Sequence, residues 1–191
     1  MSTRGSIGVL ANGILKLTYN HSDSYPESLG VALAEQLTDL LSRHDQTSLK
    51  ALADCISVVD PDSKPTEAQK QKLAALADLN VSERSLDDWY CLTRNLQGEL
   101  ALVLEKVGIM CDGSDFPKDS LFCEWAYVAN FDDMTLEVFK GFQTKQHSKG
   151  RFADPTCTEE YKPVKLVKTF KLDALLKPLM AKWIKTKIVT G

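Results

Sequence analysis

Alternating apolar and polar residues at the start of the chain predict a β-hairpin. Two runs rich in Ile, Val, Leu and Tyr cover 6–11 and 14–19, and Asn12-Gly13 separates them. This dipeptide readily adopts the positive φ angles of a two-residue type I′ turn, which is typical of tight hairpins. The turn fixes the register, so that residue 11 lies across from residue 14 and the pairs continue outward from there.

The same register brings polar side chains together at the open end of the hairpin. It places Arg4 across from His21 and Ser2 across from Asp23. Facing residues on paired strands have Cβ atoms about 5 Å apart, so their side chains lie within reach of one another. A cation, an imidazole and a carboxylate are therefore expected to cluster where the second strand ends.

Apolar residues spaced three and four positions apart predict several helices after the hairpin. The clearest begins at Pro26, a residue suited to the first helical turn, and runs through Arg43. Leucines form its buried face: Leu29, Leu33, Leu37, Leu40 and Leu41. Further helices are predicted from about Ser48, from the N-cap Thr66, and from Ser85, which begins a capping-box pattern.

Strand character returns in the second half of the chain, over 121–128, 136–139 and 164–170. Between the last two strands, the polar stretch 143–162 predicts a long surface loop. Asp173 is then expected to cap a final helix.

The order of these elements is strands, a helical block over 26–107, and strands again. This order favours an α+β fold rather than alternating β and α units. We expect a single domain over residues 1–191, with an antiparallel sheet of about five strands made from the N-terminal hairpin and the C-terminal strands.

Composition places limits on this picture. The 191 residues are 43% hydrophobic and 26% charged, which is typical of one globular domain with a sizeable core. No run of about eighteen apolar residues is present, and the N-terminus lacks the apolar core of a signal peptide, so we expect a cytoplasmic protein without a membrane partner. Five cysteines without a Cys-x-x-Cys pair favour free thiols over a disulfide framework.

Charge is distributed unevenly along the chain. The Lys-rich C-terminal segment, residues 162–191, contains eight lysines and one acidic residue, for a net charge of +7, whereas residues 1–161 carry −10. A solvated face is the simpler interpretation, and a surface for an anion or an acidic partner is the functional one. Arginine, the usual residue for bidentate phosphate and guanine contacts, is absent from the segment, which argues against nucleic acid.

The polar connection between the hairpin and the first helix carries the strongest candidate chemistry. His21, Asp23 and Tyr25 offer an imidazole, a carboxylate and a phenol, which can serve as base, orienting group and acid. Arg4 and the N-terminus of the following helix would add an anion site. A structural role is the alternative, because Asp23 or Ser24 could cap that helix. The sequence therefore predicts ligand binding by Arg4, His21, Asp23 and Tyr25.

Two further residues are candidates for catalysis. Glu124 lies within an apolar strand, and its pKa would rise if the side chain faced the core. Ser2, freed by removal of Met1, would resemble the nucleophile of N-terminal-nucleophile hydrolases, although the chain has too few strands for their fold.

Signatures for metals and cofactors are weak. Asp112 and Asp115 could bind a metal, but their loop lacks the distant glutamate of an EF-hand, and a plain turn is the simpler interpretation. No Cys/His set has zinc spacing, and no glycine-rich phosphate loop opens a helix. We therefore expect no metal and no cofactor.

Three groups of residues form longer motifs: Thr3-Arg4-Gly5; Tyr19 to Pro26 with Leu29-Gly30; and Asp112-Gly113-Ser114-Asp115 with Leu121 to Val128. Together they resemble a group of uncharacterised proteins encoded by bacteriophages and by some bacteria. The resemblance implies a phage origin and action in the cytoplasm of a bacterial host, and it supplies no catalytic residue.

These observations leave three hypotheses open. The first is a non-enzymatic protein that binds a small anionic or nucleotide-like ligand, which in a phage would counter host defence signalling. The second is a hydrolase or transferase that uses His21 and Asp23. The third is an interaction module that contacts a host protein through the Lys-rich C-terminal segment. Self-association into a homo-oligomer is compatible with each of them.

Overall fold

The computed structural model describes residues 3–174 and 176–190. Its strands are β1 (Gly5–Ala11), β2 (Ile14–Asn20), β3 (Ser57–Val59), β4 (Ile109–Cys111), β5 (Trp125–Asn130), β6 (Thr135–Lys140) and β7 (Lys165–Lys171). Its α-helices are α1 (Val31–Arg43), α2 (Gln46–Asp54), α3 (Glu67–Leu73), α4 (Trp89–Thr93), α5 (Leu100–Leu102) and α6 (Leu176–Thr190). Short 3₁₀ or π turns are η1 (Pro26–Gly30), η2 (Ala74–Leu76), η3 (Arg94–Leu96), η4 (Val103–Val107) and η5 (Phe116–Lys118).

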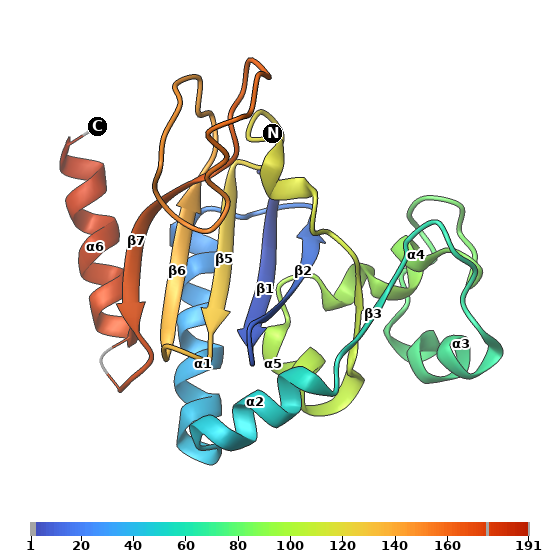
Figure 1. Cartoon of the computed structure of the whole chain (residues 1–191). Helices are drawn as coiled ribbons and strands as arrows, with labels where there is room; N and C mark the ends of the chain where they lie inside the picture. Colours follow the sequence, from blue (N-terminus) through green and yellow to red (C-terminus); the bar gives the residue numbers. More distant parts are fainter. Residues whose placement is uncertain (1–2, 175, 191) are drawn as a thin grey trace.

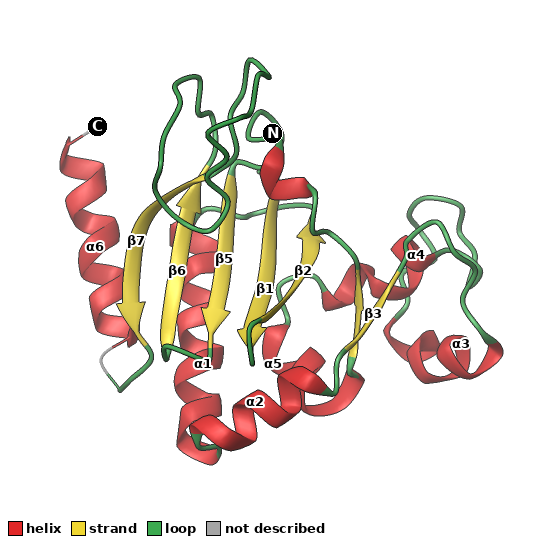
Figure 2. Cartoon of the chain, in the orientation of Figure 1, coloured by secondary structure: helices red, strands yellow, loops and turns green. Residues whose placement is uncertain are grey.

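The main sheet has five strands in the order β2-β1-β5-β6-β7 (Figures 1 and 2). The α+β class and the number of strands are therefore confirmed. The sheet is mixed rather than antiparallel, because β1 and β5 run parallel, with Gly5 facing Trp125. The helical block returns the chain to the end of the sheet where β1 begins, so β5 starts beside β1 and follows its direction.

The predicted hairpin register is confirmed throughout β1 and β2. Ala11 faces Ile14, and the pairing continues outward to Gly5 and Asn20. Asn12 and Gly13 have φ angles of 50° and 75°, as a type I′ turn requires.

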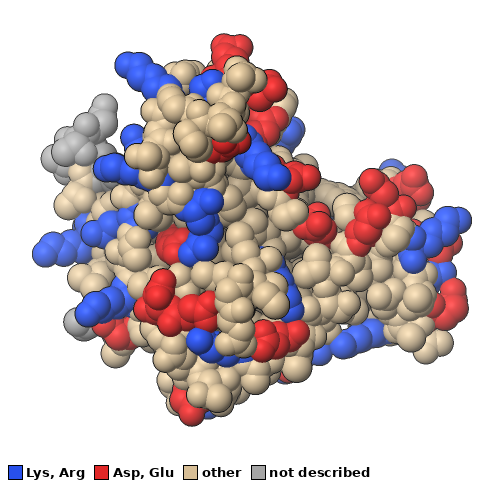
Figure 3. All heavy atoms as spheres, in the orientation of Figure 1, with Lys and Arg blue, Asp and Glu red and all other residues tan. Residues whose placement is uncertain are grey.

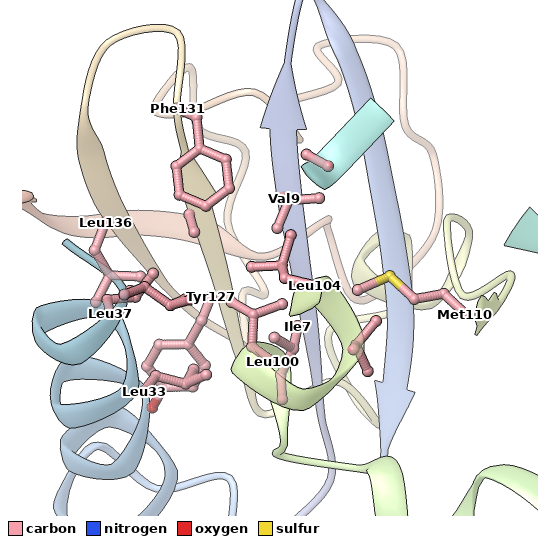
Figure 4. Close-up of a cluster of buried hydrophobic side chains, with 14 of the residues drawn as sticks. Ile7, Val9, Leu33, Leu37, Leu100, Leu104, Met110, Tyr127, Phe131 and Leu136 are labelled. Carbon is pink, nitrogen blue, oxygen red and sulfur yellow. The ribbon is translucent and has the colours of Figure 1, made fainter. Parts of the chain in front are cut away.

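One face of the sheet packs against helices. Alternate residues of the central strands point to this face, and α1 lies behind the sheet in the view of Figure 1. Leu33 and Leu37 of α1 and Leu100 of α5 share this core with Tyr127 of β5 (Figure 4). The buried leucines of α1 are Leu33, Leu37 and Leu40, as the spacing of three and four predicts, whereas Leu41 is half-buried. The helix begins at Val31 rather than at the predicted Pro26, and Leu29 lies in the preceding η1.

The opposite face is covered by the connection between β6 and β7, drawn green in Figure 2. Phe152 of this connection packs edge-on against Phe139 of β6, with ring centroids 4.8 Å apart. Arg151 donates two hydrogen bonds to the carboxylate of Glu137, at 2.7 and 2.6 Å. The predicted surface loop is therefore the second layer of the fold on this side.

One of the predicted helix starts is confirmed and another is wrong. Thr66 and Gln69 form a complete capping box at the start of α3, which confirms that N-cap. Ser85 does not begin a helix, because its hydroxyl accepts from the N–H of Asp87 in a turn. The side chain of Asp88 caps α4 instead.

The block over 26–107 also contains a strand that the sequence pattern missed. β3 pairs in parallel with β4 in a small second sheet. Each strand is three residues long, which is too short to show a period-two pattern.

Candidate functional site

Arginine and aromatic side chains gather where β2 ends. We call Arg4, Tyr19, His21, Tyr90 and Arg94 the basic–aromatic cluster. Arg4 directly precedes β1, Tyr19 belongs to β2, and His21 follows β2. Tyr90 comes from α4 and Arg94 begins η3, so the cluster combines residues of the hairpin region with residues of the helical block.

Two tyrosine rings position the imidazole of His21. The hydroxyl of Tyr19 lies 3.1 Å from His21 Nδ1, within hydrogen-bond distance. The ring of Tyr90 meets the imidazole edge-on, with centroids 6.1 Å apart. On its other side, Tyr19 stacks edge-on against Phe116 at 4.9 Å, which fixes the phenol.

Gln97 joins the two halves of the cluster. The backbone N–H of His21 donates to Gln97 Oε1 at 2.9 Å. The guanidinium of Arg94 donates to the same oxygen, also at 2.9 Å. One amide oxygen therefore sets the position of both the histidine backbone and the arginine side chain.

Burial and positive charge keep the imidazole neutral. Burial lowers the pKa of His21, and the charges of Arg94 and Arg4 lower it further. Burial raises the pKa of Tyr19, against the opposing effect of Arg4. At neutral pH the cluster thus holds two cations beside a neutral imidazole and a neutral phenol.

Arg4 reaches this cluster from an exposed position. Its guanidinium carbon lies 5.6 Å from the centroid of the exposed Phe122 ring. Its backbone carbonyl accepts from the N–H of Glu124, which holds the start of β1 beside the start of β5. The positive charge of Arg4 contributes to the lowered pKa of His21.

Asp23 and Tyr25 occupy different surroundings. Asp23 is exposed with a φ of 56°, and its backbone carbonyl accepts from Leu29 N–H. Tyr25 is 46% exposed and is the N-cap residue of η1 without a side-chain capping hydrogen bond. The alternative that Asp23 or Ser24 caps this helix through its side chain is therefore wrong.

Ser24 is buried for a different reason. Its hydroxyl accepts from the amide of Asn20 at 2.8 Å, and its carbonyl accepts from the hydroxyl of Tyr127 at 2.9 Å. Gly5 lies so close that an added Cβ would be 2.6 Å from the Ser24 hydroxyl. These contacts lock the connection, so Asn20 and Ser24 have structural roles.

Glu124 lies outside the strand that was predicted to hold it. β5 begins one residue later, at Trp125, and Glu124 is half-buried rather than in the core. Its N–H and C=O bond to Arg4 and Gly141, which extends the ladder by backbone contacts alone. Ser2 and Met1 lie outside the described residues.

An acidic groove adjoins the cluster at Tyr19. It has a volume of about 570 Å³, and Asp112, Asp115 and Asp119 line it. In the described part of the chain, no three His, Cys, Asp or Glu side chains are arranged to hold a metal ion. Asp112 accepts from Ser114 N–H at 2.9 Å, as in a turn.

Sequence reasoning missed Tyr90, Arg94 and Gln97 as members of the site. Tyr90 and Arg94 are four residues apart and share one helical face, which is a detectable signal. Nothing local connects them with His21, because the bond to Gln97 spans 76 residues.

Comparison of the chain with family models, with curated proteins and with solved structures finds no match in any of the three. The resemblance to phage-encoded proteins therefore stays a prediction. Within residues 3–174 and 176–190, no helix has both the length and the apolar character needed to cross a membrane.

Proposed function

We propose that this protein binds a small anionic, nucleotide-like ligand at the basic–aromatic cluster. The observation that carries the proposal is the pair of guanidinium groups near His21. Arg94 donates to the Gln97 oxygen that also accepts from the His21 backbone, and Arg4 precedes Gly5, which pairs with Asn20 beside His21. Among the described residues, no carboxylate forms an ion pair with either arginine. Two arginines without acidic partners beside one imidazole favour an anion from outside the chain.

The aromatic side chains favour a ligand in which the anionic group is attached to a planar ring. Tyr19, His21 and Tyr90 present ring edges and faces at the surface, and all three are half-buried. Planar heterocycles stack on such rings, with about 1 to 3 kcal/mol per base in single-stranded nucleic acid complexes. A phosphate on the arginines and a base on the rings would use both kinds of group.

The imidazole of His21 is neutral in these surroundings. When Nδ1 accepts from the Tyr19 hydroxyl, Nε2 carries the ring proton. Because burial and the two arginines lower the pKa of His21, this state prevails at neutral pH. Of the predicted binding residues, Arg4 and His21 belong to this cluster, whereas Asp23 and Tyr25 lie in different surroundings at the start of η1.

A thermal-shift experiment tests the proposal. Wild type, Arg4→Ala/His21→Ala, Arg94→Ala and the control Lys149→Ala are melted with mono-, di- and cyclic nucleotides, and with adenosine as an uncharged match. A ligand at one hundred times its Kd adds about 2.7 kcal/mol to the free energy of unfolding. We expect at least one nucleotide to stabilise wild type and the control but not the cluster variants. Identical melting of all proteins with every nucleotide would refute binding at this site.

A hydrolase or transferase is the second proposal. The lowered pKa of His21 leaves the imidazole unprotonated at neutral pH, as a general base requires. The hydroxyl of Tyr19 lies within hydrogen-bond distance of His21 Nδ1, so the phenol would take the orienting role. Turnover of a nucleotide that is lost in His21→Ala, with folding retained, would favour catalysis over binding.

The wider role in a phage, sequestering a host signalling nucleotide, depends on the sequence resemblance. Stabilisation by cyclic nucleotides in preference to ATP would support it, whereas a preference for ATP would count against it.

A further inference from the structure

A groove lies at the edge of the sheet farthest from the basic–aromatic cluster. It has a volume of about 480 Å³ between β7 and α6. Apolar side chains of both elements line it, namely Phe170, Leu179 and Trp183. The rings of Phe170 and Trp183 meet edge-on at 5.8 Å, and Leu179 is 41% exposed. Of these three side chains Leu179 is exposed, Trp183 is half-buried and Phe170 is buried, so the floor of the groove is apolar and Leu179 stands at its rim.

The groove runs along the edge strand of the main sheet. β7 is the last strand, paired on one side with β6. The connection between β6 and β7 covers the first residues of β7, where Leu166 N–H donates to the carbonyl of Lys149 at 3.3 Å. Residues 168–171 lie beyond that contact, and they line the groove.

The ladder shows which backbone groups of this edge point outward. Leu172 N–H donates to the carbonyl of Met134, so these two residues form a hydrogen-bonded pair. Such pairs alternate along an antiparallel ladder, and Thr169 and Lys171 are the residues in between. Their N–H and C=O groups are directed away from β6, as an added strand requires.

Lysines surround these groups. Lys168, Lys171 and Lys182 line the groove, together with Asp173. The ammonium of Lys168 lies 5.4 Å from the centroid of the Phe170 ring. Across the described residues, no carboxylate forms an ion pair with any of these three lysines. Figure 3 shows this gathering of Lys and Arg side chains, in blue, over β7 and α6 at the left-hand edge.

We propose that an extended acidic segment of a partner protein adds to β7 as a sixth strand and inserts one apolar side chain between β7 and α6. The backbone of Thr169 and Lys171 would supply affinity, and the lysines would select acidic neighbours. Lysines on an edge strand usually prevent it from pairing with the edge strand of another molecule. Here they would prevent pairing with β7 of a second copy of the chain, because that strand carries the same positive charges. An acidic segment escapes this repulsion, so the same residues exclude self-pairing and admit the partner.

Peptide binding to the full chain tests the proposal. The probe is a pool of nine-residue peptides in which glutamates alternate with threonines around a central Leu, Ile or Phe. The two comparison pools replace glutamate by lysine or carry N-methylated backbones. We expect saturable binding of the acidic pool alone. Protection of the Thr169 and Lys171 amides against hydrogen exchange should accompany it.

Charge reversal supplies the matched variants. Lys168→Glu/Lys171→Glu should weaken binding at least about tenfold, whereas Lys185→Glu, on α6 but outside the groove, should leave it unchanged. Leu179→Ser tests the apolar pocket and should weaken binding without loss of amide protection in β1.

Four results would overturn the proposal. The first is no binding of the acidic pool, and the second is equal binding of the N-methylated pool, since charge alone would then explain it. The third is a dimer in sedimentation that dissociates in Leu179→Ser, which would assign the groove to a second copy of the chain. An oligonucleotide that displaces the peptides and binds more tightly would assign the surface to nucleic acid instead.

Discussion

Side chains at the end of β2 and in the connection after it divide into inward and outward groups. Asn20 and Ser24 are buried, and the amide of Asn20 donates to the hydroxyl of Ser24. Tyr19 and His21 point to the cluster with Arg94. The unusual density of polar residues in this short segment thus has two causes, and only the second would concern the proposed ligand.

The pKa of His21 provides a direct probe of the cluster. Replacing Arg94 by Gln should raise this pKa, because a nearby positive charge that disfavours the imidazolium is removed. Arg4→Gln should raise it by a smaller amount, since Arg94 is the larger of the two charge effects. NMR titration of the three histidines measures both shifts.

The control for this titration is Arg94→Lys, which retains the charge and should leave the pKa of His21 near its wild-type position. An unchanged pKa in both Gln variants would show that the guanidinium groups do not act on the imidazole.

Asp132 makes stability depend on acidic pH. The ammonium of Lys50 and the N–H groups of Gly13 and Asn12 lower the pKa of Asp132 to about 2. A carboxylate with a lowered folded pKa stabilises the fold above its unfolded value of about 3.9, and this contribution disappears as pH falls towards 2. Asp132→Asn should therefore be less stable than wild type near neutral pH, by an amount that shrinks below about pH 4.

Chemical denaturation of both proteins across this pH range measures the difference. A difference that stays constant from neutral pH down to pH 2 would exclude the carboxylate charge as its source.

Single elements of this fold depend on side chains from distant segments. The ammonium of Lys16 donates to the carbonyls of Ala53, Asp54 and Ile56, at 2.8, 3.0 and 2.7 Å. A strand residue thereby satisfies the C-terminal carbonyls of α2 and places a positive charge at the negative end of the helix dipole.

Replacing Lys16 by Met should destabilise the protein by about 2 kcal/mol, because charged hydrogen bonds to half-buried carbonyls are lost. Denaturant unfolding measures the loss, and Lys16→Arg serves as the charge-retaining comparison. Equal stability of Lys16→Met and wild type would contradict this role.

The loop between β6 and β7 is fastened by an ion pair with little exposure. The side chains of Arg151 and Glu137 are 24% and 12% exposed, and Asn130 also donates to this carboxylate at 3.1 Å. Arg151→Ala leaves the carboxylate without its cation, which should cost about 3 kcal/mol and increase proteolysis within 141–164.

The double variant Glu137→Leu/Arg151→Leu should lose less stability than Arg151→Ala, since no buried charge then lacks a partner. Additive losses in the two positions would show that the pair acts as two independent contacts.

At the scale of the whole molecule, we expect the centre of the sheet to be the part most protected against amide hydrogen exchange. Every residue of β1 is buried, and β2 and β5 pair with it on both sides. We expect the slowest amide hydrogen exchange in β1 and β5 and the fastest within 144–160. Exchange of β1 at the rate of the loop would contradict a single cooperative sheet.

Local patterns predict local structure well in this chain. The Asn12-Gly13 turn, the leucine face of α1 and the Thr66 cap each depend on residues a few positions apart. The pairing of β1 with β5 and the approach of Gln97 to His21 depend on residues far apart, for which the sequence holds no local signal. That is why the predicted sheet was antiparallel and the predicted site lacked Tyr90 and Arg94.

The parallel pairing of β1 with β5 has a consequence for biosynthesis. Gly5 leaves the ribosome long before Trp125, its partner in the sheet. At about 5 to 20 residues per second, this apolar strand waits roughly ten seconds for its neighbour. During that interval the nascent hairpin exposes a strand edge and an apolar face, the features that chaperones bind. The yield of folded protein in a cell should therefore depend on translation speed and chaperone supply.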